Sequence, residues 1–573
     1  MKLQKIVRVC GLFVLLALGA LQLSAANVYA APIVTISPAS LLNADGTLDL
    51  AKRAQGSLNL KGWQVSLDPQ RGPVLTANEP NVPGWSAVAN GVNGRVSAMA
   101  FMGTDLYIGG SFTEICGNAT CDSGNLPIKY IAKWNGSSWS ALGFGVDEPV
   151  NALAVNGSDL YVGGYFEWVC MNAACNAVTT VNHIAKWDGS EWSKLIRGVG
   201  GPSGSSYYSV DTITVVGSDV YVGGYFPYAC GSIGCSLDNI RVNNVAKWNG
   251  SNWSALGFGL NSSVDASVIS GDDLYIGGDF AYRCGNETCA SGNVRMNNIA
   301  KWSLVTNSWS SLGYGLSYSV HTLKVNGGEL YVGGEFWQVC ADEACSNGSI
   351  RANRIAKWNG ANWAALGAGV AGSVHDIEFV GNDIYVGGDF AELCQDDACQ
   401  YPTAIVHFLA KWNGSAWSGL GYGVGGFGPP DTVQALATQG SEIYVVGNFP
   451  NVCGDFYCAQ NNLKVNSITK YNPATACLTK PDKPLLWIPE NNRAVNKRPT
   501  LFWRTTRCGV KYNIIIKDAA TGKVVEKKTG FDPNVQAYRL AKPLTKGKSY
   551  KWFVEAQNDF GKRKSKARIF TVK

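Results

Sequence analysis

The stretch VNALAVNGSDLYVGGYF at 150–166, followed by a loop with two cysteines and by HIAKWDGSEWSKL at 183–195, is one copy of a unit that recurs along the chain. Four short apolar runs make up this copy, at 150–155, 160–166, 183–187 and 192–195. Asn-Gly, Asp-Gly and Gly-Ser-Asp segments between such runs favour hairpin turns, because these residues accept positive φ. The unit therefore predicts four antiparallel strands.

Seven copies of the unit follow one another, with their cysteine pairs 54 to 60 residues apart. Four antiparallel strands per copy predict a seven-bladed β-propeller, since a solenoid would show one parallel strand per short repeat. A first "WSAV" at Trp85 precedes any complete unit, and the last unit stops at Tyr471 without its outer strand. We therefore expect strand 85–89 to complete the seventh blade and close the ring.

The cysteines follow the same period. Fourteen of the 17 form C-x4-C pairs: Cys116/Cys121, Cys170/Cys175, Cys230/Cys235, Cys284/Cys289, Cys340/Cys345, Cys394/Cys399 and Cys453/Cys458. Zinc would need four clustered ligands, and no His lies inside these loops, so seven local disulfides are expected. Cys477 and Cys508 are left to each other, and Cys10 lies in the leader.

The chain begins with a predicted signal peptide at 1–31. Lys2, Lys5 and Arg8 precede the apolar run 10–23, and Val28-Tyr29-Ala30 is a small-residue exit. The run is shorter than the roughly 20 residues of a membrane span. An exported protein, secreted or held at the cell surface, is therefore expected, in a compartment where disulfides persist.

The composition excludes two classes of protein and divides the chain. With 46% hydrophobic and 16% charged residues, the chain is neither a disordered charged tail nor a membrane bundle. Positions 32–474 hold 22 basic and 35 acidic residues, whereas positions from 475 onward hold 23 basic and 7 acidic residues. We expect an N-terminal extension at 32–84, the propeller at 85–474 and a separate basic domain at 475–573.

The repeat motifs "LYVGGxF" and "IAKWNG" resemble those of secreted kelch-like, galactose-oxidase-like propeller proteins over about 85–472. The resemblance implies a fold and leaves function open, because such propellers serve as enzymes and as binding platforms. The copper ligands of galactose oxidase have no counterparts among the four His of this chain.

The C-terminal domain resembles a fibronectin type III-like, immunoglobulin-like β-sandwich. Trp503 comes early and "SYKWFVEAQNDFG" comes late, with alternating strand-like segments between them. Within it, a cationic strip that would contact an anionic cell-envelope polymer is expected at Lys562, Arg563, Lys564, Lys566 and Arg568. Nothing in this region favours nucleic acid.

Polar residues interrupt the inner strands at equivalent places. Just after the first Val of each strand come Ser97, Asn151, Asp211, Asp265, His321, His375 and Gln434. Just after each "GG" come Ser111, Tyr165, Tyr225, Asp279, Glu335, Asp389 and Asn448. Equal spacing from the turn predicts three facing pairs at the channel mouth, namely Asp265/Asp279, His321/Glu335 and His375/Asp389.

Three interpretations of these six residues are open. They form a solvated polar rim, a divalent cation site such as one for Ca²⁺ or a transition metal, or a catalytic acid–base cluster around His321, Glu335, His375 and Asp389.

The loops between second and third strands carry all the C-x4-C pairs, so length variation is expected on one face of the repeats. Scaffolds usually place binding loops in this way. Aromatic residues gather in this part of the sequence, and ring stacking on a sugar would use them: Tyr165, Trp168, Tyr225, Tyr228, Tyr282 and Trp337.

Three functions remain in contention. The leading hypothesis is an exported, non-enzymatic recognition protein that binds a glycan or a protein through the long-loop face. The second is an extracellular polysaccharide lyase or hydrolase that works from the channel-mouth acids and histidines. The third is a structural surface protein that only displays other modules.

Overall fold

The computed structural model describes residues 82–573 apart from 203–206, 233–234, 347, 400–401, 427–430, 456, 474–482, 490–491, 505–510, 532–536 and 559–560, and before residue 82 only four short strands. Two compact units divide the chain, Met1–Glu79 and Pro80–Lys573. In the first unit β1 (Thr35–Ile36) pairs with β2 (Ser57–Leu58), and β3 (Trp63–Asp68) pairs with β4 (Gly72–Ala77). The predicted signal peptide lies outside the described residues.

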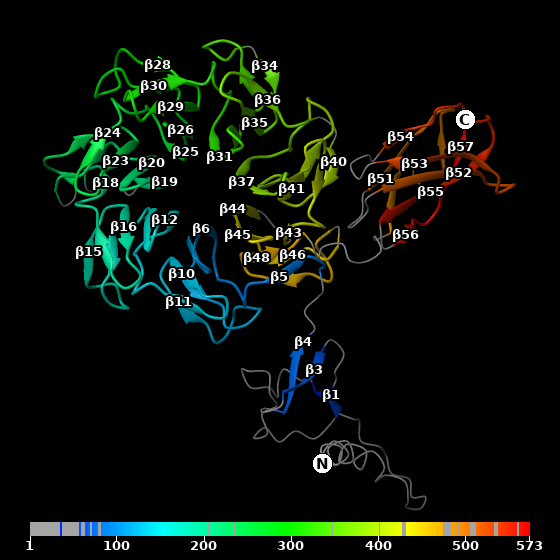
Figure 1. Ribbon diagram of the computed structural model, residues 1–573. Coiled ribbons are helices and arrows are strands. Elements are labelled where there is room, and N and C mark those ends of the chain that lie inside the picture. Colours follow the sequence, from blue (N-terminus) through cyan, green and yellow to red (C-terminus); the bar gives the residue numbers. More distant parts are fainter. Residues whose placement is uncertain are drawn as a thin grey trace, which may run out of the picture. The chain divides into compact units, whose positions relative to one another are not determined.

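Seven antiparallel four-stranded sheets follow one another among the described residues (Figure 1). The first three consist of β6 (Val96–Met102), β7 (Asp105–Gly110), β10 (Ile131–Trp134) and β11 (Trp139–Ala141); β12 (Val150–Asn156), β13 (Asp159–Gly164), β16 (Ile184–Trp187) and β17 (Trp192–Lys194); and β19 (Ser209–Val216), β20 (Asp219–Tyr225), β23 (Val245–Trp248) and β24 (Trp253–Ala255).

The next three sheets have the same strand order. They consist of β25 (Val264–Ser270), β26 (Asp273–Gly278), β29 (Ile299–Ser303) and β30 (Ser308–Ser311); β31 (Val320–Asn326), β32 (Glu329–Gly334), β35 (Ile355–Trp358) and β36 (Trp363–Ala365); and β37 (Val374–Val380), β38 (Asp383–Gly388), β41 (Leu409–Trp412) and β42 (Trp417–Gly419).

The seventh sheet combines strands from both ends of the repeat region. It consists of β44 (Thr432–Gln439), β45 (Glu442–Asn448), β48 (Ile468–Tyr471) and β5 (Trp85–Ala87). Tyr471 lies opposite Trp85 in this pairing, and their rings are 4.8 Å apart. The innermost strands of successive sheets contact one another, and β44 also contacts β6.

The predicted fold class is corrected at this point. We expected a seven-bladed β-propeller closed by the N-terminal strand, followed by an immunoglobulin-like sandwich. The structure shows many small antiparallel sheets, and none of those described is closed or curled on itself. Strand pairing stops at the edges of each four-stranded sheet, and neighbouring sheets meet through packed side chains. The chain is therefore described as an all-β repeat fold of open sheets.

Successive units pack where a glycine of one accepts a valine of the next. A Cβ atom placed on Gly333 in β32 would lie 2.5 Å from Val374 Cγ1 in β37, so only a glycine leaves room for that valine. The same approach occurs at Gly109, Gly163, Gly223, Gly277 and Gly387. The seventh unit has Val446 in this place, buried beside Val96 in a shared core cluster.

Each unit also carries a smaller sheet that the sequence analysis did not predict. These sheets consist of β8 (Glu114–Ile115) and β9 (Leu126–Pro127); β14 (Trp168–Cys170) and β15 (Val178–Thr180); β18 (Val199–Gly200), β21 (Tyr228–Ala229) and β22 (Ile240–Arg241); β27 (Tyr282–Arg283) and β28 (Val294–Arg295); β33 (Gln338–Cys340) and β34 (Gly348–Arg351); β39 (Glu392–Cys394) and β40 (Pro402–Ile405); and β43 (Val424–Gly425), β46 (Asn451–Val452) and β47 (Leu463–Lys464).

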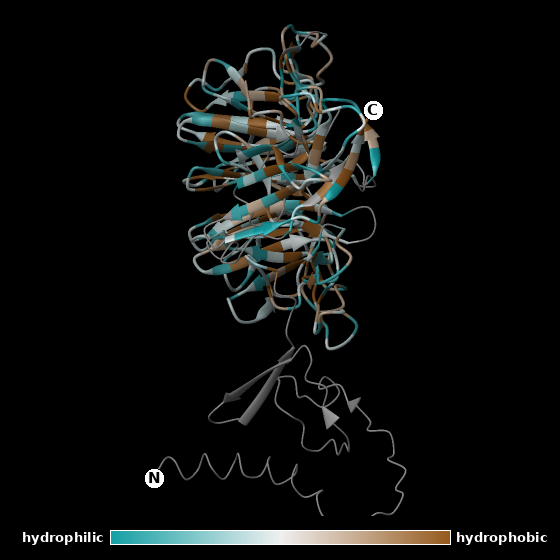
Figure 2. Cartoon of the chain, turned by 90° about the vertical axis from the view of Figure 1, so that its right-hand side faces the viewer, coloured by the Kyte–Doolittle hydropathy of each residue, from teal (hydrophilic) through white to brown (hydrophobic). Residues whose placement is uncertain are grey.

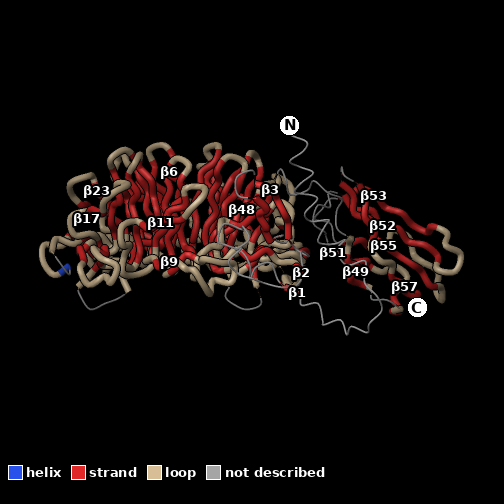
Figure 3. The backbone as a smooth tube through the Cα atoms, turned by 90° about the horizontal axis from the view of Figure 1, so that it is seen from below, coloured by secondary structure: helices blue, strands red, loops and turns tan. Residues whose placement is uncertain are grey.

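We call the segment between the second and third strands of a unit, with its small sheet, the excursion. In Figure 3 the strands of the repeat region form a layer with loops on its two sides, and β9 lies on one of these sides. Hydrophobic and hydrophilic residues alternate along many of the strands (Figure 2). The second strand of a unit is nevertheless buried almost throughout, as in β13 and β38, because neighbouring units cover both of its faces.

The C-terminal part has its own core. One sheet contains β49 (Leu485–Ile488), β51 (Thr500–Arg504) and β54 (Ala537–Arg539), and the other contains β50 (Arg493–Val495), β52 (Lys511–Asp518), β53 (Val524–Phe531), β55 (Ser549–Asn558), β56 (Gly561–Lys564) and β57 (Arg568–Val572). Trp503 from the first sheet and Trp552 from the second are fully buried in the same cluster. Within the described residues no helix is long and apolar enough to cross a membrane.

The pairing of β5 with β48 is expected to stabilise the whole repeat region. Replacing Trp85 by Ala would remove a ring that is 7% exposed and would lower the free energy of unfolding by about 3–5 kcal/mol. Denaturant unfolding followed by fluorescence measures this effect. Ser86→Ala, on the same strand but exposed, is the control and should change stability by less than about 0.5 kcal/mol. Equal stability of both variants would contradict the prediction.

Candidate functional site

A β-bulge in the innermost strand of every unit presents one polar side chain. In β25, Val264 pairs with Gly278 and Ala266 pairs with Gly277, so Asp265 between them has no partner across the hairpin. A bulge re-aims the side chain of its extra residue, which explains why a polar residue interrupts an apolar strand. The seven bulge residues are Ser97, Asn151, Asp211, Asp265, His321, His375 and Gln434.

The bulge residues of the second and third units are hydrogen-bonded to each other. Asn151 Nδ2 donates to Asp211 Oδ1 at 2.7 Å, and the Ser209 hydroxyl donates to Asp211 Oδ2 at 2.7 Å. Burial nevertheless dominates here and raises the pKa of Asp211 to about 6.

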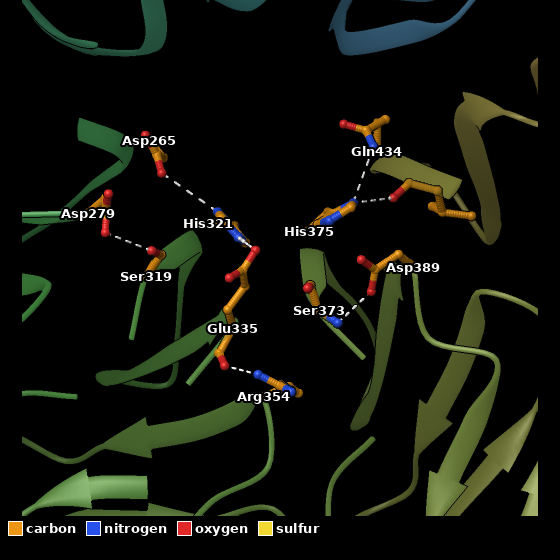
Figure 4. Close-up of polar contacts among 11 residues, drawn as sticks. Asp265, Asp279, Ser319, His321, Glu335, Arg354, Ser373, His375, Asp389 and Gln434 are labelled. Carbon is orange, nitrogen blue, oxygen red and sulfur yellow. Dashed lines mark hydrogen bonds and ion pairs between the residues drawn. The ribbon is translucent and has the colours of Figure 1, made fainter. Parts of the chain in front are cut away.

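His321 lies between two carboxylates from neighbouring units (Figure 4). Its Nδ1 is 3.6 Å from Asp265 Oδ2 and its Nε2 is 3.4 Å from Glu335 Oε1. Burial by itself would lower the pKa of His321, but the hydrogen bonds and charges of Asp265 and Glu335 outweigh it, so the pKa is raised above its ordinary value. The two carboxylates therefore stabilise the protonated form of this imidazole.

His375 has the opposite electrostatic setting. Its Nδ1 is 3.1 Å from the Val433 carbonyl oxygen and 3.2 Å from Gln434 Nε2, and its ring centre is 5.7 Å from that of His321. Burial lowers the pKa of His375; Asp389 opposes this shift, and the neighbouring His321 adds to it. The pKa values of these two adjacent imidazoles are therefore shifted in opposite directions.

Only one of the three predicted facing pairs makes direct contact. His321 meets Glu335 as expected. Asp279 instead accepts a hydrogen bond from the Ser319 hydroxyl of the next unit at 3.0 Å. All three hairpins contain the same bulge, which takes the bulge residue out of the hairpin register, so equal spacing from the turn does not decide which pairs make contact.

Asp389 shows the same displacement from its predicted partner. Its Oδ1 accepts a hydrogen bond from the backbone N–H of Ser373 at 2.5 Å, within its own unit (Figure 4). It acts on His375 through its charge, and the structure gives no hydrogen bond between the two side chains.

The metal hypothesis gains no support from this arrangement. Among the described residues, no group of three or more His, Cys, Asp or Glu side chains is placed to hold an ion. The six predicted ligands are spread over three units, and several of their oxygens are taken up by serine or histidine partners.

Sequence reasoning missed a second charged group one step further along the inner strands. Lys324 Nζ in β31 is 2.9 Å from Glu378 Oε2 in β37. The nearby Asp376 accepts hydrogen bonds from the Thr322 hydroxyl and from the backbone N–H of Leu436. The equivalent residue is Glu378 itself in the sixth unit and Ala, Thr or Val in the other units, so comparison of repeats was the signal that could have found this pair.

The seven predicted local disulfides are confirmed. They join Cys116 to Cys121, Cys170 to Cys175, Cys230 to Cys235, Cys284 to Cys289, Cys340 to Cys345, Cys394 to Cys399 and Cys453 to Cys458. Each disulfide therefore lies within one excursion and links no two units. The predicted pairing of Cys477 with Cys508 lies outside the described residues.

The two cysteines of a pair are not equivalent, although the spacing treated them alike. The first cysteine is buried in every unit. The second is half-buried at Cys121, Cys175, Cys289, Cys345 and Cys399, and it is buried at Cys235 and Cys458. The first sulfur therefore anchors the excursion in the core, and the second usually lies nearer the surface.

The second cysteine also has a backbone conformation that the spacing did not predict. Its φ is positive, between 50° and 56°, which is uncommon for a residue other than glycine. Its N–H donates to the carbonyl oxygen three residues earlier, as from Cys121 to Asn118 at 3.1 Å, so the four residues between the cysteines form a tight turn. The residues with this conformation are Cys121, Cys175, Cys235, Cys289, Cys345, Cys399 and Cys458.

The first cysteine ties the excursion to the rest of the unit. The backbone N–H of Cys340 donates to the carbonyl oxygen of Gly315 at 3.0 Å, in the segment that joins two successive sheets. The first cysteine of every other pair makes the equivalent bond to a glycine carbonyl. Each excursion therefore lies beside that joining segment.

Four of the six predicted binding aromatics are exposed, and they belong to three different units. Trp168 and Tyr165 in the second unit, Tyr225 in the third and Trp337 in the fifth are each 40–50% exposed. Trp337 lies 6.0 Å from the ring of Tyr318. These side chains are therefore available separately, one or two to a unit.

Tyr228 and Tyr282 are committed to arginines instead. Arg241 lies across the small sheet from Tyr228, with its guanidinium 4.9 Å from the ring and its Nη1 donating to the tyrosine hydroxyl at 2.9 Å. Arg295 and Tyr282 repeat this arrangement at 5.2 Å and 3.0 Å. These two tyrosines hold their own excursions together.

The fifth unit departs from this pattern. Gln338 stands where the third and fourth units have tyrosine, and it lies opposite Arg351. The Arg351 Nε donates to the carbonyl oxygen of Asp397, in the cysteine loop of the next unit, at 3.1 Å. Without a tyrosine ring beside it, this arginine reaches toward its neighbour.

A pocket of about 360 Å³ lies between the fifth and sixth units. Its walls are Trp337, Arg351, Asn353, Arg354, Val370, Ala371, Ala398 and Cys399. Arg354 has a positive φ of 69° and its Nη1 donates to the carbonyl oxygen of Glu335 (Figure 4). The pocket therefore adjoins the cluster around His321. Of its walls, the sequence analysis singled out only Trp337 and Cys399.

The C-terminal basic residues lie at one strand and just beyond it. In β56, Lys562 is 3.5 Å from Glu555 and Lys564 lies 4.3 Å above the ring of Phe553. Contact of this strip with an envelope polymer stays a prediction.

Comparison with known proteins yields no family. No protein-family model matches the chain, and no curated protein matches it. Among solved structures, the extracellular domain of a hybrid two-component system from B. thetaiotaomicron matches at 10% identity and a TM-score of 0.43, over 92% of this chain and 64% of that one.

Two further solved structures match other portions. The computationally designed protein Ika8 matches at 12% identity and a TM-score of 0.35, over 67% of this chain and 98% of its own. A human fibronectin type-III domain matches at 23% identity and a TM-score of 0.12, over 16% of this chain and 87% of its own. These scores carry no argument about function, and the kelch-like resemblance stays a prediction.

The four histidines of the chain allow a direct check of the inner-strand cluster. In ¹⁵N-histidine spectra recorded against pH, we expect His321 to titrate above ordinary histidine, and His375 and His183 below it, with His183 near a pKa of about 4 because of burial. Asp265→Asn should lower the pKa of His321.

The same assignment fixes the direction of the effect on stability. Because the pKa of His321 is higher in the folded than in the unfolded chain, its contribution is complete below the ordinary histidine pKa of 6.5 and is lost as the pH rises through the folded value. Asp265→Asn should therefore cost more stability at pH 5.5 than at pH 8.5. A His321 that titrates below ordinary histidine would contradict the assignment.

Proposed function

We propose that this protein is an exported, non-enzymatic recognition protein that binds an extracellular glycan through the excursion side of its repeats. The observation that carries the proposal is the pocket beside Trp337. It offers an exposed indole ring, hydrogen-bond donors and a volume of about 360 Å³. Ligand sites for small molecules commonly fall between about 300 and 1,000 Å³.

The excursions are built as rigid supports, which favours binding over a merely structural role. In the fifth unit, the disulfide Cys340–Cys345, the pairing of β33 with β34 and the hydrogen bond from Cys340 to Gly315 all restrain one segment. A loop that is already ordered loses less conformational entropy when a ligand binds. Such supports also suit export, since disulfides persist in oxidising compartments.

A glycan suits the pocket better than a protein partner. Protein interfaces of standard size bury about 800 Å² on each partner and rely on a central apolar cluster. The exposed aromatics among those predicted to bind are instead one or two to a unit, and the pocket combines one ring with polar side chains. Sugars present both an apolar ring face and hydroxyl groups, which such a site can contact together.

The rival function is a polysaccharide lyase or hydrolase. The observation that favours it is His321, held between Asp265 and Glu335 beside the pocket. A charged imidazolium next to a carboxylate can donate a proton while the carboxylate accepts one. The rival therefore predicts turnover, and the recognition hypothesis predicts binding without turnover.

The binding proposal is tested with a panel of immobilised glycans and the full mature chain. Trp337→Ala should weaken binding about 10-fold or more, because burying an aromatic ring against a ligand contributes roughly 1.5–3 kcal/mol. Val216→Ala is the control, since Val216 is exposed to a similar degree but lies at the β19–β20 hairpin, outside the excursions.

The same panel separates the functions by its products. Binding that survives in Trp337→Ala as in Val216→Ala would contradict the proposed site. Release of new sugar ends by the wild type, abolished in Glu335→Gln, would replace recognition by the enzymatic rival. Neither binding nor release on any glycan would leave the structural role as the better description.

A further inference from the structure

We propose that the pocket between the fifth and sixth units recognises a sugar residue that carries a carboxylate, as in a uronic acid. This inference rests on the proposed function and names the class of glycan it would bind. Its basis is a pair of guanidinium groups, Arg351 and Arg354, that line the pocket together with Trp337.

The two arginines bring positive charge into a repeat region that is otherwise acidic. Positions 32–474 hold 22 basic against 35 acidic residues. Among the described residues the structure pairs neither guanidinium with a carboxylate. Each instead donates to a backbone carbonyl, Arg351 to Asp397 and Arg354 to Glu335, which uses one of its five N–H groups.

A bound anion would accept hydrogen bonds from the guanidinium N–H groups that these backbone contacts do not use. Two like charges that line one cavity repel each other, and an anion between them replaces that repulsion by attraction. The planar fork of a guanidinium matches a carboxylate with two parallel hydrogen bonds. Asn353 in the same wall donates to the carbonyl oxygens of Ala368 and Asp397 and so fixes the loop that carries the opposite wall.

Trp337 decides between a carboxylated sugar and a bare anion. Its side chain is 40% exposed and lines the same cavity as the two arginines. A small inorganic anion has no apolar face for an indole ring, whereas a pyranose ring stacks on it while its carboxylate reaches the guanidinium groups. The combination therefore favours a uronate over phosphate or sulfate.

Comparison between units shows why this site occurs once among the described residues. In the third and fourth units the arginine equivalent to Arg351 is held by a tyrosine, as in the Arg295–Tyr282 pair. In the fifth unit Gln338 replaces that tyrosine, and Arg351 turns toward the next unit. The change of one cross-strand partner frees the cation for a ligand.

The test uses calorimetric titration of the full mature chain with oligogalacturonate, alginate and hyaluronan oligosaccharides, each beside its carboxyl-reduced counterpart. At least one acidic oligosaccharide should bind about 10-fold or more tightly than its reduced form, and this preference should shrink at high salt. Arg351→Gln should abolish the preference, so that the acidic oligosaccharide binds no more tightly than its carboxyl-reduced counterpart.

Two matched variants make the test specific. Arg295→Gln removes the equivalent cation of the fourth unit and should leave affinity within about twofold, since that arginine is held by Tyr282. Gln338→Tyr keeps every arginine but restores the tyrosine beside Arg351, and it should reduce the preference as Arg351→Gln does.

The outcomes distinguish this inference from the proposed function. Equal affinity for acidic and reduced oligosaccharides, lost in Trp337→Ala, would overturn the carboxylate inference and support recognition of a neutral glycan at the same pocket. An acid preference that persists in Arg351→Gln and in Arg354→Gln would overturn it as well. Absence of binding by every oligosaccharide, acidic or reduced, would overturn both.

Discussion

The rest of the structure depends on a close approach between units, in which a valine of one inner strand occupies the space over a bare glycine of the preceding unit. At Gly333 a Cβ atom would lie 2.5 Å from Val374 Cγ1, so the contact requires glycine. This contact occurs six times among the described residues, and bulge residues of neighbouring inner strands come within reach of one another, as Asn151 and Asp211 do. The cluster around His321 is a consequence of that packing, since Asp265 and Glu335 reach it from two different units.

In a repeat protein, the residues that differ between units are the best candidates for a functional role. The residues that all units share form strands, disulfides and contacts between sheets, so few of them are available to bind or react with a ligand. Functional side chains occur where one unit differs from its neighbours. Lys324 stands where the units other than the sixth have Ala, Thr or Val, and Gln338 stands where the third and fourth units have tyrosine. Both residues belong to the fifth unit, and the pocket and the paired histidines lie in the fifth and sixth units.

Much of the local structure could be predicted from the sequence, and much of the site could not. The four strands of the unit and the seven disulfides followed from turn residues and spacing, because, apart from β5, both depend on contacts within a single unit. Of the three predicted facing pairs only His321/Glu335 shows a side-chain contact, although all three hairpins contain the same bulge, so counting from the turn could not tell which pair would meet. The predicted propeller class was also wrong, because spacing within a unit says nothing about how separate sheets are joined.

The sequence by itself therefore determined the repeating unit of 54 to 60 residues, with its strands, turns and cysteine pairs. All of these features arise from covalent geometry and hydrogen bonding within the unit. Only the tertiary structure decided which side chains of different units meet. Arg351 has the same place in the unit as Arg241 and Arg295, and only the contact with Asp397 shows that its side chain bonds to the next unit while its backbone stays paired in its own sheet. The physical reason is that a side chain such as Arg351 contacts a residue 46 positions away in the sequence, and the packing between sheets sets the distance between those two residues.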